Sequence, residues 1–536
     1  MLTASALTGR REGVAGMLTR APYDTLYQGF RWQVPERLNM AAQVCDDWAE
    51  KDPERVAIID LTGKRQETSY GALREMADAL ALHLEAQGIG RGDRVGVLRS
   101  QDAWCAAAHV AIWKLGAVSI PLFKLFQLDA LSTRLGDAGA RIVISDAEAV
   151  DLLQQVPGVA ALVPEEVDLP KGRMAPAATG PEDAAVLIYT SGTTGSPKGA
   201  LHGHRMLLGH LPGVEISHDF LGQPGDCLWT PADWAWIGGL FDVLMPGLAL
   251  GVPVVAARLP KFTPEACARV LRDGGVRNVF FPPTALRMLK AEGCAVPGLR
   301  SVASGGEPLG AEMLDWGRRA FGLTINEFYG QTECNMVASS CGTLFAPRAG
   351  AIGRAVPGFE IGVIDAQGQE VAGAEEGDIA IRRGAASMML GYWNRPEATA
   401  EKFRGDWMLT GDRGVLEDGY LRFVGREDDV ITSAGYRIAP AEIEDCLLTH
   451  EAVATVGVIG KPCALRTQIV KAYVVLKPGV TGTEELARAL QAHVKARLAG
   501  HCYPREVAFL EALPMTVTGK VIRRELKARA AGEAAS

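Results

Sequence analysis

Apolar runs and helix-like stretches alternate through the first half of the chain. The segment Thr68–Gly88 places apolar residues at helical spacing, with Thr68 or Ser69 as its cap. Short apolar runs typical of strands are Arg94–Arg99, Val118–Leu122, Ala140–Asp146, Val252–Ala257 and Asn278–Pro283. Strands that alternate with helices predict parallel sheets covered by helices, and therefore an α/β fold.

The pattern changes around Val424, where a shorter unit begins. We expect helices near Pro440–Leu448 and Thr483–Leu498 and a final basic helix from Gly519. The strands expected in this unit are Ala454–Ile459, Lys471–Leu476 and Glu506–Leu510. These elements predict a small α+β domain, and they divide the chain into residues 1–427 and 428–536. Asp428 at the junction is a candidate hinge, with a solvated linker charge as the alternative.

Composition limits the classes of function. The chain has 536 residues, of which 48% are hydrophobic, so it can bury several cores. The net charge of -8 argues against a protein that coats nucleic acid and against a polybasic membrane binder. Ten cysteines without a CxxC pair indicate free thiols in a reducing compartment. No apolar run is long enough to span a bilayer, so we expect a cytoplasmic protein without membrane insertion.

The segment YTSGTTGSPKG, Tyr189–Gly199, directly follows the apolar run Ala184–Ile188. A buried strand therefore delivers a loop rich in glycine, hydroxyl groups and one lysine, Lys198, to the edge of a sheet. Backbone N–H groups, hydroxyls and an ammonium in such a loop can surround phosphate oxygens. The Walker pattern GxxxxGK[ST] does not fit these glycine positions. A flexible Gly/Ser linker is the plain alternative, and the preceding buried strand makes it the weaker one.

Two further segments carry groups that suit a purine nucleotide. They are Ser304–Gly310, SGGEPLG, and Asn326–Glu333, NEFYGQTE. Tyr329 offers a stacking face, Gln331 a polar partner, and Glu333 a carboxylate for Mg²⁺. A turn with a core tyrosine is the structural alternative for this segment.

Charged residues at two later positions complete the candidate site. In Trp407–Gly414 and the following GRED segment, Asp412 and Arg426 can hold two ribose hydroxyls. Either residue alone is more simply explained as one partner of a surface ion pair. In Pro514–Leu526, Lys520 follows a glycine in a polar turn before a helix. A C-terminal lysine is ordinarily a solvated charge, and only the turn distinguishes this one.

Together these segments resemble the adenylate-forming superfamily of acyl-CoA synthetases, peptide-synthetase adenylation domains and luciferases, from about Leu38 to the last helix. The likeness is greatest to medium-chain acyl-CoA synthetases, through YGQTE, GDWMLTGDRG, GREDDVITSAGYRIAPAEIE and RTQIVKAYVVL. It implies a large N-terminal domain of parallel, helix-covered sheets with a distorted barrel, and a small mobile C-terminal α+β domain that carries the catalytic lysine.

The resemblance implies a role for each matching residue. The β- and γ-phosphates would be bound by Thr190, Ser191, Gly192, Thr193, Thr194, Gly195, Ser196, Pro197 and Lys198. The adenine and α-phosphate wall would be formed by Glu327, Phe328, Tyr329, Gly330, Gln331 and Thr332, with Gly306, Glu307 and Pro308 as further nucleotide contacts. Glu333 would ligate Mg²⁺, Asp412 and Arg426 would bind the ribose, Lys520 would reach the α-phosphate, and Asp428 would be the hinge.

Coenzyme A and the acyl group are also placed by the resemblance. Candidate CoA contacts are Ala434, Gly435, Tyr436, Arg437, Arg466, Lys495 and Tyr503. In the acetate-specific branch a Trp and a Val close the acyl pocket, and Gly330 and Gly305 stand at those positions here. A larger pocket, lined by Trp234, Trp236, Ile237 and Gly238, is therefore expected, with plain core packing of the tryptophans as the alternative.

The expected function is that of an ATP- and Mg²⁺-dependent acyl-CoA synthetase. It would convert a medium-chain, branched or aryl acid to an acyl-adenylate, release pyrophosphate, and transfer the acyl group to CoA. The alternatives are an adenylating enzyme that loads a carrier-protein thiol and a nucleotide-binding protein without turnover. The partners are small molecules, and the sequence leaves a monomer and a homodimer open. A metal site in His202–His210 is disfavoured, because no carboxylate or cysteine stands at ligand spacing.

Overall fold

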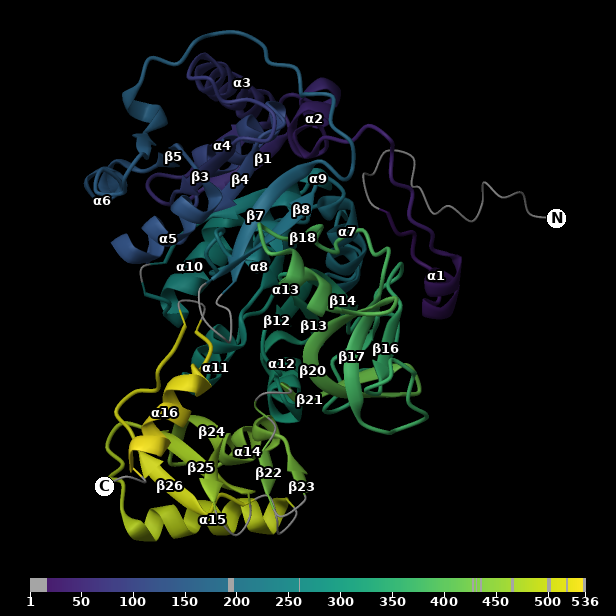
Figure 1. The fold of residues 1–536 in the computed structure, drawn as a ribbon, viewed down its shortest axis with the longest axis vertical. Helices are drawn as coiled ribbons and strands as arrows, with labels where there is room; N and C mark the ends of the chain where they lie inside the picture. The colour runs from purple at the N-terminus through teal and green to yellow at the C-terminus, as the bar shows by residue number, and fades with distance from the viewer. Residues whose placement is uncertain are drawn as a thin grey trace, which may run out of the picture.

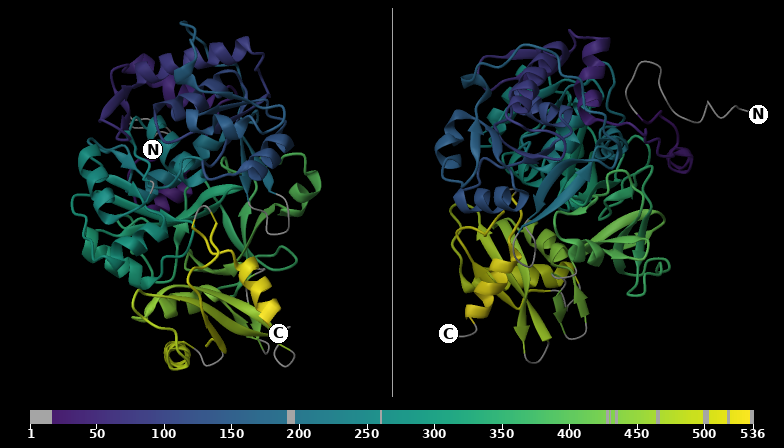
Figure 2. Two further views of the ribbon diagram at one scale, coloured as in Figure 1. Left: turned by 90° about the vertical axis from the view of Figure 1, so that its left-hand side faces the viewer. Right: turned by 45° about the horizontal axis from the view of Figure 1, so that its top comes forward.

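The computed structural model describes residues 17–190, 197–259, 261–426, 429, 431–433, 436–463, 467–498, 503–516 and 519–533. Figure 1 shows a large body that contains the two sheets formed by β1 to β21, and below it a smaller unit that contains β22 to β26. Figure 2 shows the same separation from two further directions. Glu427 and the predicted hinge Asp428 lie outside the described residues, so the boundary at 427/428 stays a prediction.

The first sheet of the large body contains the strand that leads into the phosphate loop. Its order within the described residues is β18 (Gly391–Tyr392), β8 (Lys198–Gly203), β7 (Ala184–Thr190), β4 (Val118–Pro121), β3 (Arg94–Leu98), β5 (Ile142–Ser145) and β6 (Ala160–Leu162). Strands β7, β4, β3, β5 and β6 run parallel, as the alternation of apolar runs predicts. In contrast, β8 pairs antiparallel with β7. The phosphate loop therefore joins two strands of a hairpin.

The second sheet of the large body combines a parallel and an antiparallel part. Its described parallel strands are β12 (Ser301–Gly305), β13 (Ile325–Gln331), β11 (Asn278–Phe280), β9 (Leu228–Trp229), β10 (Val254–Ala256) and β1 (Val56–Asp60), with β2 (Gln66–Ser69) antiparallel at the end. The antiparallel part is β14 (Cys334–Ser339), β15 (Gly353–Ala355), β21 (Tyr420–Arg426), β20 (Trp407–Glu417), β17 (Gly377–Arg382), β16 (Ile361–Ile364) and β19 (Phe403–Arg404).

Helices pack between the two sheets. Residues of α3, α4, α7 and α9 share one core with β3, β7, β1 and β10, and fully buried Trp113 and Phe241 belong to it. The predicted amphipathic helix is α3, and Ser69 caps it by accepting a hydrogen bond from Ala72 N at 3.3 Å. The helices of the large body are α1 (Tyr23–Gly29), α2 (Asp47–Lys51), α3 (Tyr70–Ala86), α4 (Ala103–Lys114), α5 (Leu128–Ala138), α6 (Val150–Leu153), α7 (Met206–Ser217), α8 (Ile237–Gly239), α9 (Met245–Ala249), α10 (Pro264–Gly274), α11 (Pro283–Ala291), α12 (Ala311–Phe321) and α13 (Pro396–Glu401).

The small unit has its own sheet and its own core. The strands are β22 (Ile431–Ser433), β23 (Tyr436–Ile438), β24 (Val453–Cys463), β25 (Thr467–Leu476) and β26 (Glu506–Phe509), and the helices are α14 (Pro440–Leu448), α15 (Glu484–Arg497) and α16 (Arg523–Glu533). These elements confirm an α+β unit. The last helix begins at Arg523 and not at Gly519, because Val521, just before it, is held in an antiparallel bridge with Met515.

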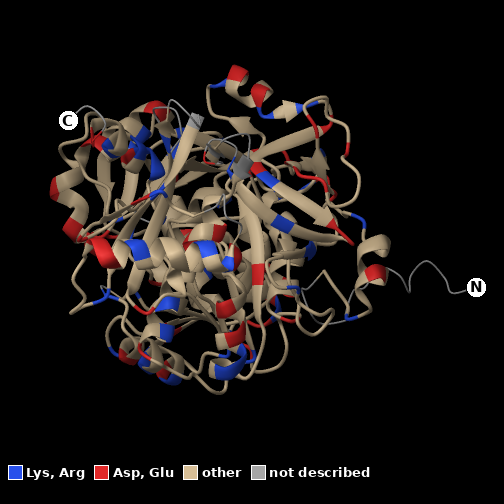
Figure 3. Ribbon diagram, turned by 90° about the horizontal axis from the view of Figure 1, so that it is seen from below, with Lys and Arg blue, Asp and Glu red and all other residues tan. Residues whose placement is uncertain are grey.

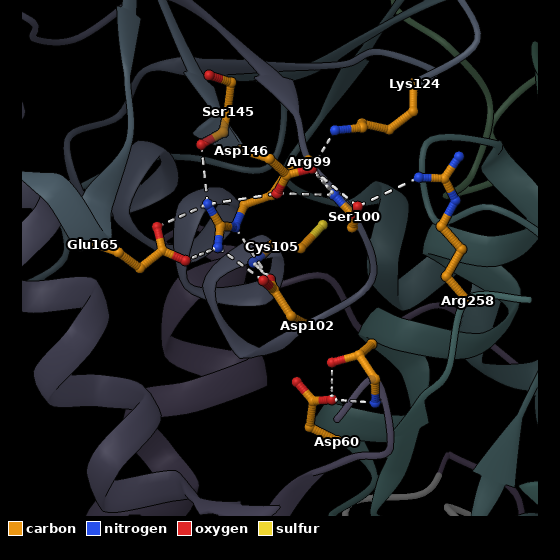
Figure 4. Close-up of polar contacts among 11 residues, drawn as sticks. Asp60, Arg99, Ser100, Asp102, Cys105, Lys124, Ser145, Asp146, Glu165 and Arg258 are labelled. Atoms are coloured by element: carbon orange, nitrogen blue, oxygen red, sulfur yellow. Dashed lines mark hydrogen bonds and ion pairs between the residues drawn. The ribbon is translucent and has the colours of Figure 1, made fainter. Parts of the chain in front are cut away.

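A cluster of charged side chains closes the carboxyl ends of β3, β4 and β5 (Figure 4). Arg99 Nη2 contacts Asp102 Oδ2 at 2.8 Å, and Lys124 Nζ contacts Asp146 Oδ2 at 2.5 Å. Asp102 also caps α4 by accepting from Cys105 N at 2.7 Å. Because the charges shown in Figure 4 for Arg99 and Lys124 are paired with carboxylates, the cluster stabilises this edge and is not a free anion site.

Basic and acidic residues are interspersed along the described part of the ribbon (Figure 3). Among the described residues, no helix is both long and apolar enough to cross a membrane.

Candidate active site

The two ends of the phosphate loop lie side by side. Thr190 at the end of β7 pairs in register with Lys198 at the start of β8. The preceding Tyr189 donates its phenolic hydrogen to Asp137 Oδ2 at 2.7 Å, which ties the base of the loop to α5. Ser191, Gly192, Thr193, Thr194, Gly195 and Ser196 lie outside the described residues. The hairpin nevertheless fixes where the loop begins and ends.

The two segments predicted to hold the purine belong to adjacent parallel strands. Gly305 on β12 is paired with Phe328 on β13, so Gly306, Glu307 and Pro308 emerge beside Tyr329 and Gly330. Glu327 contacts the loop that follows β12. Its buried carboxylate accepts from Leu309 N at 3.2 Å, and burial raises its pKa to about 8. Glu327 thus supports the loop that carries Glu307.

Tyr329 connects this strand pair to the predicted ribose site. Its phenolic oxygen donates to Asp412 Oδ2 at 2.5 Å. Asp412 on β20 is paired in register with Arg426 on β21. Burial raises the pKa of Asp412, and the Tyr329 hydrogen bond and the nearby Arg426, Lys402 and Lys520 oppose that rise. The predicted ribose pair and the predicted purine residue therefore lie together.

Lys520 of the small unit reaches the site of the large body. A methyl group built on Gly306 would lie 3.8 Å from Lys520 Cε and 3.5 Å from the Trp236 ring. Surrounding protein atoms lower the pKa of Lys520, and Glu307 and Asp412 oppose that shift. Solvent still reaches the side chain, so Lys520 lines an open site and is not packed in a core. Behind it, Gly519 approaches Thr284 of α11.

Glu333 lies in the turn after β13, beside Thr332. Tyr392 donates its phenolic hydrogen to Glu333 Oε1. The ring of the same tyrosine faces Lys198, with Nζ 5.4 Å from the ring centroid. Glu333, predicted as a metal ligand, and Lys198, predicted to hold phosphate, are therefore joined through one side chain that sequence reasoning missed.

The predicted acyl-pocket residues separate into two groups. Trp234 and Ile237 are buried in the main core. Trp236 is only partly buried, and its ring centroid lies 5.6 Å from that of Phe280. The Trp236 ring also covers Gly238, where an added Cβ would approach ring atoms to 2.6 Å. Trp236 is thus the tryptophan that reaches the site beside Lys520, whereas Trp234 packs as the structural alternative expects.

The two glycines expected to open the acyl pocket have no empty space on their Cβ side. A Cβ on Gly305 would lie 2.5 Å from the ring of Phe328. A Cβ on Gly330 would lie 2.4 Å from both Asn335 Oδ1 and Met336 N. The missing side chains are therefore replaced by atoms of the chain itself. The expectation that the missing side chains of Gly305 and Gly330 leave space for a larger acyl group has to be corrected at these two positions. The boundaries of the acyl pocket stay a prediction.

The CoA candidates are only partly described. Ala434, Gly435 and Arg466 lie outside the described residues, and Tyr436 and Arg437 are described only as backbone of β23. Lys495 Nζ lies 5.6 Å from the ring centroid of Tyr503, and Arg505 Nη1 donates to the Tyr503 hydroxyl at 3.0 Å. The structure thus brings Lys495 and Tyr503 together and adds Arg505. Helix α15, which carries Lys495, lies on the side of the small unit away from the large body (Figure 1).

The histidines of His202–His210 show no metal arrangement. His204 Nδ1 accepts from Met40 N at 3.1 Å, and His210 Nδ1 contacts Met206 O at 2.8 Å. Burial lowers the pKa of both imidazoles to about 4. No group of three or more His, Cys, Asp or Glu side chains among the described residues is placed to hold a metal.

Sequence reasoning missed Tyr392, Lys402 and Arg505. Lys402 follows α13, and its Nζ lies 3.4 Å from Thr410 O, which also accepts from Gln331 Nε2 at 3.0 Å. The aromatic pair Tyr392–Trp393 after an apolar run, and the YPR sequence ending at Arg505, were the available signals. Neither signal names a partner, because Tyr392 and Glu333 are 59 positions apart in the chain.

Comparisons with known proteins identify the family. The AMP-binding enzyme family matches residues 45–393, and the C-terminal domain of AMP-binding enzymes matches residues 442–520. The acetyl-coenzyme A synthetase of Bacillus subtilis (strain 168) is 32% identical, covering 94% of each chain. The mitochondrial acyl-coenzyme A synthetase ACSM2 of Rattus norvegicus is 33% identical, covering 93% of this chain and 92% of its own.

A solved structure agrees with these relatives. The anthranilate CoA ligase AuaEII in complex with anthranoyl-AMP superposes with a TM-score of 0.85 at 26% identity, covering 94% of this chain and 99% of its own. The chain belongs to the AMP-binding enzyme family. Within that family it groups with the acyl-CoA synthetases, which are AMP-forming acid–thiol ligases.

Proposed function

We propose that the chain is an ATP-dependent acyl-CoA synthetase for medium-chain, branched or aryl carboxylic acids. The observation that carries this proposal is the position of Lys520, which the small unit places beside Gly306 and near Glu307 and Asp412 of the large body. An ammonium at the junction of the predicted purine and ribose segments is the arrangement that adenylation requires.

The first half-reaction is limited by charge. A substrate carboxylate has to attack the α-phosphorus, which negative oxygens surround, so cations that neutralise this centre lower the barrier. Lys520 would supply one such cation, and Thr332, in the turn beside Glu333, would donate to an α-phosphate oxygen. The substrate acid is already ionised at about pH 7, so no general base is needed. The Asp412 carboxylate and Arg426 would hold the ribose.

The residues around Glu333 fit a magnesium ion. Mg²⁺ commonly takes one or two carboxylates and otherwise phosphate and water oxygens. Glu333 is such a single carboxylate, and one of its oxygens, Oε1, is already held by Tyr392. When bound, Mg²⁺ would neutralise charge on the phosphate oxygens. Glu333 is the residue we assign to it, with Lys198 on the phosphate side.

The second half-reaction needs a different surface of the small unit. Lys495, Tyr503 and Arg505 form a cationic and aromatic group that suits the phosphates and adenine of CoA. Helix α15, which carries Lys495, lies on the side of the small unit away from the large body (Figure 1), whereas Lys520 lies beside Gly306 of the large body. We infer that rotation of the small unit near Asp428 exchanges the two surfaces between the half-reactions.

The preference for acids larger than acetate rests on the aromatic groups beside Lys520. Trp236 is the partly buried ring of this group, and the buried rings of Phe280 and Phe328 support it from the core, with centroid separations of 5.6 Å and 5.1 Å. An aromatic ring at this position favours an apolar or aryl acyl group over a methyl group.

A panel of acids tests the proposal. The purified protein is incubated with ATP, Mg²⁺, CoA and short, medium-chain, branched and aryl acids, and pyrophosphate and thioester are measured. We expect both products, with acetate among the poorer substrates. Pyrophosphate without thioester, together with transfer to a phosphopantetheinylated carrier protein, would favour the carrier-loading alternative. The absence of both products with every acid would contradict the proposal.

A further inference from the structure

Tyr392 contacts two residues of the site that come from different sheets. Its phenolic group donates to Glu333 Oε1 in the turn before β14. Its ring faces Lys198 at the start of β8, with Nζ 5.4 Å from the ring centroid. One side chain therefore contacts both the carboxylate assigned to the metal and the ammonium assigned to the phosphates.

The backbone around Tyr392 is fixed to the same two elements. Leu390 N donates to Leu201 O at 2.7 Å and Trp393 N donates to Gly199 O at 2.7 Å, so the segment is paired along β8. On its other side, Met389 N donates to Glu333 O at 2.8 Å. Tyr392 N donates to Thr399 Oγ1 at 2.9 Å, which anchors the segment to α13. The tyrosine is thus held in place by backbone bonds that do not depend on its own side chain.

We propose that Tyr392 is a positioning residue that holds Glu333 in its metal-binding orientation and Lys198 in its phosphate-binding orientation. The inference rests on the proposed function. The phenol occupies one carboxylate oxygen and leaves the other for the metal, and outer hydrogen-bond partners of this kind set ligand orientation. The electron-rich ring face attracts the Lys198 ammonium and limits where it can lie.

The two contacts can be separated by substitution. Tyr392→Phe removes only the hydrogen bond to Glu333 and keeps the ring beneath Lys198. Tyr392→Leu removes both contacts and retains an apolar side chain. Tyr420→Phe is the matched control. Tyr420 begins β21, and its phenol donates to Ala346 O at 2.8 Å and makes no contact with Glu333 or Lys198.

The experiment measures binding and not turnover. Mn²⁺ is titrated into the protein with a non-hydrolysable ATP analogue, and free Mn²⁺ is followed by electron paramagnetic resonance. In parallel, binding of the analogue alone is measured in the presence of EDTA. Circular dichroism and a thermal melt confirm that each variant is folded.

We expect Tyr392→Phe to weaken Mn²⁺ binding about tenfold and to leave binding of the analogue in EDTA unchanged. Tyr392→Leu should weaken both, the second by about threefold. Tyr420→Phe should match the unchanged protein in both. Mn²⁺ binding by Tyr392→Phe that equals or exceeds that of the unchanged protein would overturn the inference. A failure of the proposed function would give a different result: the unchanged protein would form no acyl-adenylate with any acid.

Discussion

The phenolic oxygen of Tyr329 lies 2.5 Å from Oδ2 of Asp412, although 83 positions separate the two residues in the chain. This contact joins the segment assigned to the purine with the segment assigned to the ribose. If both residues act in their assigned roles, the ligand that contacts them carries a base and a sugar in adjacent positions, as a nucleotide does. The bond is thus the geometric basis for treating the two motifs as one site.

Tyr329→Phe keeps the ring that is assigned to the purine and removes the hydrogen bond that orients Asp412. Hydrogen bonds to charged groups contribute more than neutral ones, so the KM for ATP should rise about tenfold. The maximal rate of adenylate formation should change much less, because Lys520 is untouched. Steady-state pyrophosphate exchange at varied ATP concentrations measures both constants. An unchanged KM would mean that the Tyr329 hydrogen bond does not contribute to ribose binding.

Gly330→Ala tests whether the close packing at this strand is required. The added Cβ would lie 2.4 Å from Met336 N, and backbone atoms cannot move aside as a flexible side chain can. We expect a loss of about 1–3 kcal/mol in the free energy of unfolding and lower adenylation activity, because Thr332 and Glu333 follow directly.

Gly136→Ala in α5 is the matched control, since nothing lies within 4 Å of its added Cβ. Urea denaturation curves of both variants give the comparison. Equal stability of Gly330→Ala and the control would contradict the packing described here.

Glu327→Gln should change how stability depends on pH. The pKa of Glu327 rises from 4.5 to about 8 in the folded protein, so the folded state binds this proton more tightly than the unfolded state does. Stability contributed by the neutral acid is therefore lost as pH rises from about 4.5 towards 8. Glutamine stays neutral at every pH, so the variant does not lose stability at this position as the pH rises.

We therefore compare the difference in melting temperature, variant minus unchanged protein, at two pH values. This difference should be more positive at pH 8 than at pH 5, by about 2 °C or more. Glu85→Gln on the exposed side of α3 serves as the control and should show no such trend. A constant difference between the two pH values would mean that the carboxyl is not buried as described.

The sequence was a good guide to the helices and strands, whereas the roles of the predicted nucleotide residues stay predictions. Apolar runs at Arg94–Arg99 and Asn278–Pro283 correspond to β3 and β11, and Ser69 caps α3 as expected. The elements could be predicted because local patterns determine strands and caps. The position of Lys520 beside Gly306 is a contact between distant segments, and its role was expected only from the family resemblance.

The remaining features depend on contacts between distant segments. Tyr392 gains its importance from Glu333 and Lys198, and nothing in the residues around Tyr392 points to either. The space beside Gly305 is filled by Phe328, which only the pairing of β12 with β13 reveals. The last helix begins three residues after Lys520 because the preceding turn pairs Met515 with Val521, a contact that a helical pattern does not show.

We propose that Lys520 of the small unit stabilises charge during adenylation at a site built by the large body. Lys520→Ala, measured in the two separate half-reactions, tests this role. Formation of acyl-adenylate from acid and ATP should fall by about a hundredfold to a thousandfold, as expected when a charge-stabilising donor is removed. Thioester formation from synthetic acyl-adenylate and CoA should largely survive. An equal loss in both half-reactions, or no loss in the first, would contradict the account.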